Sequence, residues 1–262
     1  MGFIMRHSFL TAGHILILGG TAEAKQLAQQ LIVHAPHCRL TMSLAGRTSA
    51  PLQQPIPTRS GGFGGTQGLA RWLIEQRVSL LIVATHPFAA QMPVHAVEAA
   101  KQAHVPVVRL LRPAWAPEPG AFWHRCQTLL QAAQQLGNTP QRVFLPIGRQ
   151  SVASFMTAPQ HTYVVRSIEP LEERAMLPHL HSLQARGPFS QREEETLMSS
   201  WGITRMVCKN SGGSAMATKL QAACALGIPI LMVERPQLPT PITTFSSVAS
   251  LLNALQHGIF PE

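Results

Sequence analysis

The sequence predicts an α/β protein of two domains, each with a mainly parallel sheet flanked by helices. Short apolar runs typical of buried strands alternate along the 262 residues with longer amphipathic segments typical of helices. The alternation is interrupted once, by the Pro-rich segment 112–120 (RPAWAPEPG), and then restarts. We therefore predict a first domain of residues 1–118 and a second domain of residues 119–262.

The first half of the chain contains four predicted strands and three predicted helices. The strands are apolar runs bounded by turn residues, at 14–18, 38–44, 78–84 and 105–111. The helices are predicted at 22–34, 68–76 and 89–103, and the first of them is rich in Ala, Leu, Gln and Lys. Residues 45–65 are rich in Pro, Gly, Ser and Thr, so we predict irregular structure there.

The second half repeats the pattern of a strand, a Gly-rich turn and a helix. We predict strands at 142–147, 161–167, 206–209 and 228–233. We predict helices at 125–136, 191–201, 215–226 and 246–256. In the helix at 191–201, Glu193, Glu194 and Glu195 are expected to form a solvated face. Trp115 and Trp123, which flank the Pro-rich segment, are expected to be packing residues.

The composition excludes several kinds of active site. The chain has no Asp, which excludes a Ser-His-Asp triad, an EF-hand loop and an Asp-based magnesium site. Its four cysteines form no C-x-x-C pair and its histidines are scattered, so no metal site is predicted. Free thiols, and apolar runs too short for a bilayer, predict a cytoplasmic protein without a membrane partner. The net charge of +9, mostly from Arg, fits a basic surface or an anionic ligand.

The first Gly-rich turn is a candidate dinucleotide site. A buried strand ends at Gly19-Gly20-Thr21 and a helix follows at once, which places backbone N–H groups and the positive helix end where a pyrophosphate would lie. The spacing differs from G-x-G-x-x-G, so a plain tight turn is an equal alternative.

The end of the second predicted strand indicates which dinucleotide would bind. It reads Ser43-Leu44-Ala45-Gly46-Arg47, and no acid lies between Glu23 and Glu75. An acid at this place holds the ribose of NADH, whereas an Arg accommodates the 2′-phosphate of NADPH. The pattern favours NADPH as cofactor, the alternative being that Arg47 is a solvated surface residue.

Two further segments of the first half are candidate ligand sites. Gly62 and Gly64 belong to GGFGG (61–65), whose bare backbone permits close approach to a ligand, unless it is a flexible loop anchored by Phe63. Thr85 and His86 follow a central strand, at the edge where open α/β sheets bind ligands. His86 could donate a proton, or Thr85 could simply cap a helix with Pro87 in its first turn.

Cations in the second half lie at predicted strand ends. KNSGG comprises Lys209, Asn210, Ser211, Gly212 and Gly213, a turn that can form an anion nest, and Lys219 lies on the next helix. Arg149 and Arg235 follow two other strands. A shared anionic ligand is one interpretation, and scattered solvated charges are the other.

These segments together resemble the precorrin-6A reductase family of cobalamin biosynthesis, whose members act on precorrin-6A or cobalt-precorrin-6A. The resemblance extends from about His14 to Val248 and lies in the order and spacing of short motifs. The motifs are LILGGTAEA (16–24), SLAGRT (43–48), GGFGG (61–65), ATHPFAAQM (84–92), LLRPAW (110–115), IGRQ (147–150), RGPF (186–189), KNSGG (209–213) and ERP (234–236).

The resemblance implies two Rossmann-like domains with an interdomain cleft that holds NADPH and an anionic tetrapyrrole. It implies hydride transfer to C19 and a proton added at C18, which gives precorrin-6B. The cofactor would then contact Gly19, Gly20, Thr21, Ser43, Gly46, Arg47, Gly62, Gly64 and Thr85. The substrate would contact Arg149, Asn210, Ser211, Gly212, Gly213, Lys219 and Arg235. Lys209 and His86 are the candidate catalytic residues. One departure is Val83, where the family usually has Asp.

Two other functions remain open from the residues alone. A two-domain nucleotide-sugar transferase also has paired α/β domains and would not depend on NADPH. A basic nucleic-acid-binding module would show a clustered basic stripe and strongly salt-dependent binding. The dispersed basic residues and low aromatic content disfavour the module. We therefore expect a monomer with a small-molecule substrate and no nucleic-acid partner.

Overall fold

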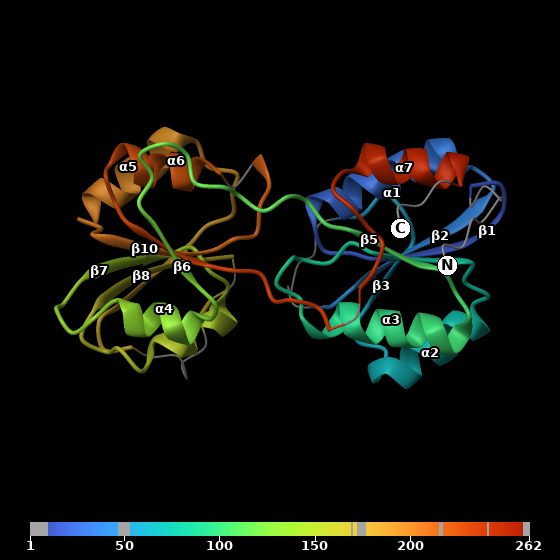
Figure 1. The fold of residues 1–262 in the computed structure, drawn as a ribbon, viewed down its shortest axis with the longest axis horizontal. Helices are drawn as coiled ribbons and strands as arrows, with labels where there is room; N and C mark the ends of the chain where they lie inside the picture. Colours follow the sequence, from blue (N-terminus) through green and yellow to red (C-terminus); the bar gives the residue numbers. More distant parts are fainter. Residues whose placement is uncertain are drawn as a thin grey trace. The chain divides into compact units, whose positions relative to one another are not determined.

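The chain folds into two compact α/β units, described here from a computed structural model that covers residues 10–46, 53–168, 170–171, 177–214, 217–239 and 241–258. The first unit comprises residues 1–113 and 237–262, and the second comprises residues 114–236. Within the described residues, each unit has one six-stranded sheet with helices on both faces (Figure 1). The predicted fold class is confirmed.

The first unit has a sheet in which every described strand pair is parallel. Its elements are β1 (Gly13–Leu18), α1 (Ala22–His34), β2 (Cys38–Leu44), β3 (Thr58–Ser60), α2 (Gly65–Glu75), β4 (Leu80–Val83), α3 (Gln91–Ala103), β5 (Val107–Leu110), β12 (Thr244–Phe245) and α7 (Val248–His257). The strand order is β12-β5-β4-β1-β2-β3, with all five pairs parallel. This is the order of a Rossmann fold, with β12 as the sixth strand.

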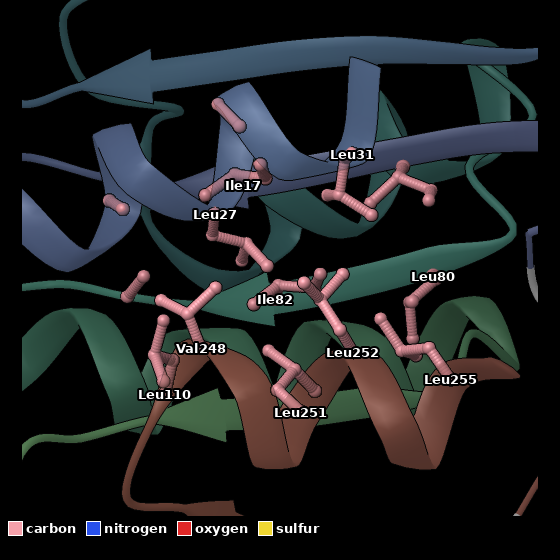
Figure 2. Close-up of a cluster of buried hydrophobic side chains, with 14 of the residues drawn as sticks. Ile17, Leu27, Leu31, Leu80, Ile82, Leu110, Val248, Leu251, Leu252 and Leu255 are labelled. Atoms are coloured by element: carbon pink, nitrogen blue, oxygen red, sulfur yellow. The ribbon is translucent and has the colours of Figure 1, made fainter. Parts of the chain in front are cut away.

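Alternate residues of each strand in the first sheet face opposite helix layers. Ile17, Ile82 and Leu110 pack with Leu27 and Leu31 of α1, and with Leu251, Leu252 and Leu255 of α7 (Figure 2). Leu16, Leu81 and Val83 face the other way, toward Leu69 and Leu73 of α2 and the alanines of α3. Because both faces are buried, these strands are apolar at nearly every position, which is why the sequence reveals them.

The second unit has a similar parallel sheet, but one edge strand comes first in the chain rather than last. Its elements are β6 (Trp123–Cys126), α4 (Leu129–Gln135), β7 (Arg142–Leu145), the 3₁₀ helix η1 (Arg149–Phe155), β8 (Thr162–Ser167), β9 (Leu180–Gln184), α5 (Gln191–Ser200), β10 (Arg205–Lys209), α6 (Thr218–Ala225) and β11 (Ile230–Val233). The strand order is β6-β11-β10-β7-β8-β9, again parallel at every pair. Helices α5 and α6 cover one face of the sheet and α4 the other (Figure 1).

The first sheet takes one edge strand from a distant part of the chain, and this corrects the predicted domains. The last segment, 237–262, returns to the first unit, where Phe245 of β12 pairs with Leu110 of β5 and α7 completes the core. The division also falls between Pro113 and Ala114 rather than after residue 118. The prediction that 119–262 forms the second domain is therefore wrong for residues 237–262.

The short edge strands are the main errors in the predicted secondary structure. β3 lies in the stretch predicted to be irregular, and β9 and β12 were not predicted. The predicted helix at 125–136 is in fact the end of β6, a turn and α4. Helix α3 begins at Gln91, so Thr85 and Pro87 do not start it. No helix in the described ranges combines the length and apolar character needed to cross a membrane.

Candidate functional site

The turn after β1 has the geometry of a phosphate-binding turn. Gly19 donates its N–H to the carbonyl of Ser43, and a Cβ added to Gly19 would lie 2.1 Å from Met42 Sδ in the core. Gly20 adopts a φ of +113°, and a Cβ there would meet no described heavy atom within 4 Å. The first glycine thus permits close packing and the second leaves open space before the N-terminus of α1.

Thr21 fixes this turn to the neighbouring strand. Its hydroxyl accepts a hydrogen bond from the N–H of Ala24 at 3.1 Å and caps α1. The same hydroxyl donates to the carbonyl of Ala84 at 2.9 Å, just beyond β4. Because the hydroxyl makes both bonds within the fold, Thr21 positions the turn and offers a ligand mainly its backbone N–H.

Arg59, the middle residue of β3, organises the ends of β2 and β3. Its guanidinium donates to Ser43 Oγ at 2.7 Å and to the carbonyls of Gly61 and Gly62 at 3.1 and 2.9 Å. The guanidinium carbon also lies 3.9 Å from the centre of the Phe63 ring. Desolvation lowers the pKa of Arg59. The Arg therefore holds the glycine loop in one conformation, with positive charge near the end of β2.

The remaining glycines of this edge adopt backbone conformations that favour glycine. Gly46 follows β2 with a φ of +68° and its loop is tied back by the Gly61 N–H, which donates to the carbonyl of Leu44. Gly64 has a φ of +82° and is the N-cap of α2. Arg47, the predicted contact for the 2′-phosphate, lies outside the described residues.

The end of β4 presents Thr85 and His86. The hydroxyl of Thr85 is buried and has no hydrogen-bond partner among the described residues. A buried hydroxyl without a partner is unfavourable, which indicates that a ligand or solvent completes it. His86 is exposed, and its Nδ1 accepts a hydrogen bond from the N–H of Phe88 at 3.2 Å. That bond leaves Nε2 as the nitrogen that carries the proton in the neutral ring.

In the second unit, the KNSGG turn follows β10 and is fixed by the Pro-rich segment. Asn210 is buried, and its side chain accepts from the N–H of Trp115 at 2.8 Å and donates to the Trp115 carbonyl at 3.2 Å. The Trp115 indole donates to the carbonyl of Gly213 at 3.0 Å.

The turn itself depends on its two glycines and on Arg235. Gly212 and Gly213 have φ values of +68° and +92°. Arg235 donates from Nε to the carbonyl of Asn210 at 2.8 Å. Asn210 and Arg235 thus shape the turn.

Cationic side chains gather around this turn. Lys209 Nζ donates to Ser151 Oγ at 2.6 Å, which links the end of β10 to η1. Lys219 is only 3% exposed, and its Nζ lies 5.2 Å from the centre of the Trp115 ring. Ser211 is buried beside them. Arg149 begins η1, and its side chain lies outside the described residues.

One buried carboxylate lies near these cations. Glu194 of α5 is 2% exposed and accepts two hydrogen bonds from Arg166, at 2.6 and 3.0 Å. The Arg166 guanidinium lies 3.9 Å from the centre of the Phe189 ring. The prediction that Glu194 belongs to a solvated face is therefore wrong. Among the described residues, Arg166, Lys209 and Lys219 outnumber the buried carboxylate of Glu194 at this end of the sheet.

Comparison with known proteins decides the family. Residues 14–256 match the family model described as "Precorrin-6x reductase CbiJ/CobK". The chain belongs to this family. It is 42% identical over 260 residues to a precorrin-6A reductase of Sinorhizobium sp, covering 99% of both chains. It is 44% identical to a precorrin-6A reductase of Rhodococcus erythropolis, over 91% of this chain and 95% of that one.

More distant relatives and a solved structure agree with the family. A cobalt-precorrin-6A reductase of Synechocystis sp. is 25% identical over 87% of this chain and 91% of its own. A solved CobK precorrin-6A reductase superposes with a TM-score of 0.87 and 39% identity, over 95% of this chain and 99% of that one. The predicted resemblance to the family is confirmed.

Within this reductase chain, the predicted residues fall into two groups, one in each unit. Gly19, Gly20, Ser43, Gly46 and Thr85 lie at the carboxyl edge of the first sheet, where the Gly19 N–H donates to the Ser43 carbonyl and Thr21 bonds the Ala84 carbonyl beside Thr85. Lys209, Asn210 and Lys219 lie around one turn of the second unit. Sequence reasoning missed Arg59 and the Arg166–Glu194 pair. The described residues contain no cluster of three His, Cys or Glu side chains that could hold a metal.

Proposed function

We propose that this protein reduces precorrin-6A with NADPH, in cobalamin biosynthesis. The observation that supports the cofactor most directly is the open turn at Gly20, between β1 and the N-terminus of α1 in a sheet of Rossmann order. When bound, NADPH supplies the hydride for C19 of the macrocycle, and a proton is added at C18. No residue of the chain needs to act as a nucleophile, which agrees with the lack of a triad.

The residues at the first sheet edge fit a phosphorylated dinucleotide. Gly19, Gly20 and the backbone of Thr21 would hold the pyrophosphate, because a helix N-terminus favours an anion. Ser43, Gly46, Gly62 and Gly64, organised by Arg59, would hold the ribose and its 2′-phosphate, with Arg47 as the predicted partner. Thr85 supplies a buried hydroxyl that has no described partner.

The second unit supplies the residues proposed to bind the tetrapyrrole. The acetate and propionate groups of the tetrapyrrole are anions, and the described side chains around the KNSGG turn include more cations than carboxylates. Ser211, Gly212 and Gly213 would offer backbone N–H groups, and Lys219, Arg149 and Arg235 would offer charge. Asn210 keeps the turn in place through its two bonds to Trp115.

Relatives favour the metal-free substrate. Curated relatives named precorrin-6A reductase are 37–44% identical, whereas those named cobalt-precorrin-6A reductase are 24–25% identical. We therefore propose precorrin-6A itself as the substrate.

The test of this function is an anaerobic assay that follows NADPH oxidation. We expect turnover with precorrin-6A and NADPH and at least tenfold lower kcat/KM with NADH, because the 2′-phosphate has a prepared site. Arg59→Met should raise the KM for NADPH by about tenfold, since the loop loses charge-assisted bonds. Equal kcat/KM for NADPH and NADH would contradict the cofactor assignment.

Lys209 is the proposed proton donor, with His86 as its competitor. Lys209→Met should lower kcat by about 10²-fold or more, as removal of a general acid does. His86→Gln is the matched comparison, and only one of the two variants should show the loss. A Lys209→Met enzyme with full turnover would remove Lys209 from this role. The KM for precorrin-6A and the stability of each variant are measured alongside. Neither should change enough to explain the loss of kcat.

A further inference from the structure

Glu23 and Arg112 form an ion pair that has no part in the proposed function. The Nη1 atom of Arg112 lies 2.8 Å from Oε2 of Glu23, and the side chains are 15% exposed for Arg112 and 24% for Glu23. Both residues belong to the first unit, although 89 positions separate them in the sequence. Because the pair is largely shielded from water, its charges act on a ligand beside them more strongly than solvated charges would.

The pair lies at the carboxyl edge of the first sheet. Glu23 belongs to the first turn of α1, two residues after the N-cap Thr21. Arg112 lies two residues beyond Leu110, where β5 ends. Thr21 already joins the start of α1 to the carbonyl of Ala84 beyond β4. The ion pair adds a second link, from the start of α1 to the segment that follows β5.

Glu23 places a negative charge where the proposed function places an anion. The pyrophosphate is assigned to Gly19, Gly20 and the backbone of Thr21, and no other acid precedes Glu75 in the sequence. At a rise of about 1.5 Å per residue, Glu23 is about 3 Å from Thr21 along the helix axis. A carboxylate in the first turn stabilises the helix, but it occupies the positive end of the dipole that a bound anion needs. An uncompensated Glu23 would therefore oppose the pyrophosphate.

Arg112 is the side chain that compensates this carboxylate. Glu23 makes no other side-chain hydrogen bond or ion pair with a described residue. The two opposite charges cancel at a distance from the ligand, so the N-terminus of α1 keeps its positive potential. The affinity of this turn for an anion thus depends on a residue that lies about 90 positions further along the chain.

We propose that Arg112 is a positioning residue for the dinucleotide, which acts by neutralising Glu23 beside the pyrophosphate. This inference rests on the proposed function, because it takes the dinucleotide from it. A purely structural ion pair makes a different prediction, since loss of either partner would then disturb the turn and weaken cofactor binding. Neutralisation predicts opposite effects, because loss of Arg112 exposes the negative charge and loss of Glu23 removes it.

The test measures the Kd of NADP⁺ by titration calorimetry on the full-length protein and its variants. Arg112→Met should raise this Kd by about tenfold, and Glu23→Gln should lower it by about two- to fivefold. The double variant should bind NADP⁺ within about threefold of the wild type, because the repelling carboxylate and its partner are both gone. Arg112→Lys keeps the charge and should also stay within about threefold.

Arg39→Met is the matched control for the loss of one positive charge. Arg39 is exposed near the start of β2, at the other end of the sheet from the turn, and its bond is to the neutral amide of Gln76. Its removal should change the Kd of NADP⁺ by less than about twofold. Melting temperatures of all variants are measured, so that any unfolded protein is recognised.

Two results would overturn the role of Arg112. One is weaker NADP⁺ binding by Glu23→Gln as well as by Arg112→Met, which is the structural outcome. The other is a double variant that binds NADP⁺ as weakly as Arg112→Met does. In both cases the wild type still binds NADP⁺, and the proposed function stands. A wild type that binds no NADP⁺ would instead refute the proposed cofactor, and this inference with it.

Discussion

His14, at the start of β1, shows how a buried titratable group is held neutral. It is 4% exposed, its Nδ1 lies 2.9 Å from the carbonyl of Gln76, and its Nε2 lies 2.8 Å from Thr41 Oγ1. The carbonyl can only accept, so Nδ1 carries the proton and Nε2 accepts from the threonine. Desolvation lowers the pKa of His14, and the same cause lowers the pKa of buried His161.

These two histidines predict that the protein loses stability in mild acid. In the unfolded chain they bind a proton below a pH of about 6.5, whereas the folded protein resists it until lower pH. The unfolded state therefore binds more protons in that window, and the free energy of unfolding falls as the pH drops from 7.5 to 5.5. Urea unfolding of His14→Gln should show a smaller decrease in the free energy of unfolding between pH 7.5 and 5.5. The double variant with His161→Gln should show a smaller decrease still. An unchanged slope in both would contradict this.

At the residue scale, the sequence predicted the glycine turns, because backbone conformation limits the choice of residue there. Gly20, Gly64 and Gly213 all have positive φ, and their clustering after strands is visible in the sequence. Arg59 was missed because nothing in the sequence near it distinguishes it from a surface Arg. Its importance comes from the pairing of β3 with β2, which brings it to Ser43.

At the element scale, α5 is attached to its sheet by a charge pair as well as by apolar packing. Glu194 and Met198 are its buried residues, and Glu194 meets Arg166 at the end of β8. Arg166 also lies over the ring of Phe189, which precedes the helix. The pair thus joins β8, the segment before α5, and α5 itself.

Breaking this pair should be strongly destabilising. Glu194→Gln leaves the buried Arg166 uncompensated, and we expect a loss of about 3–5 kcal/mol in the free energy of unfolding. Glu195→Gln is the matched control, because its bond to Gln191 joins two side chains on the outer face of the helix, and it should change stability by less than about 0.5 kcal/mol. Urea unfolding of both variants makes the comparison. Similar losses in the two would show that burial of Glu194 is not the cause.

The central strands and the helices were predictable from the sequence, and the short edge strands of the sheets were not. β1, β4, β10 and β11 are buried on both faces, so their apolar runs identify them. β3 and β12 have only three and two residues and exist because a longer strand lies beside them. The sequence predicts Glu193, Glu194 and Glu195 as a solvated face. That prediction fails for Glu194 because its burial depends on Arg166, which is distant in sequence.

At the scale of the whole molecule, the two sheets differ in where one edge strand comes from in the sequence. β6 precedes the other strands of the second sheet, and β12 follows all the other strands of the first. Val248, Leu251, Leu252 and Leu255 of α7 pack with Ile82 of β4 and Leu110 of β5 in the core (Figure 2). Unit one is therefore discontinuous in sequence, whereas unit two is continuous.

This arrangement predicts an asymmetric response to truncation. A chain that ends at Pro236 loses β12 and α7 and leaves the apolar face of β5 uncovered, so the first unit should fail to fold. Residues 114–236 include all the described strands of the second sheet and should retain it. Hydrogen exchange read by mass spectrometry would report protection in β10 and its loss in β1. Protection of β1 in the shortened chain would contradict the prediction.

The late return of β12 also sets an order of events during synthesis. When residues 114–236 have left the ribosome, the described strands of the second sheet are all available. In the first sheet, β5 then pairs only with β4 and its other edge is free. That edge can pair only after β12 has been synthesised. The N-terminal half of this reductase must therefore wait, partly assembled, for the last part of the chain to be made.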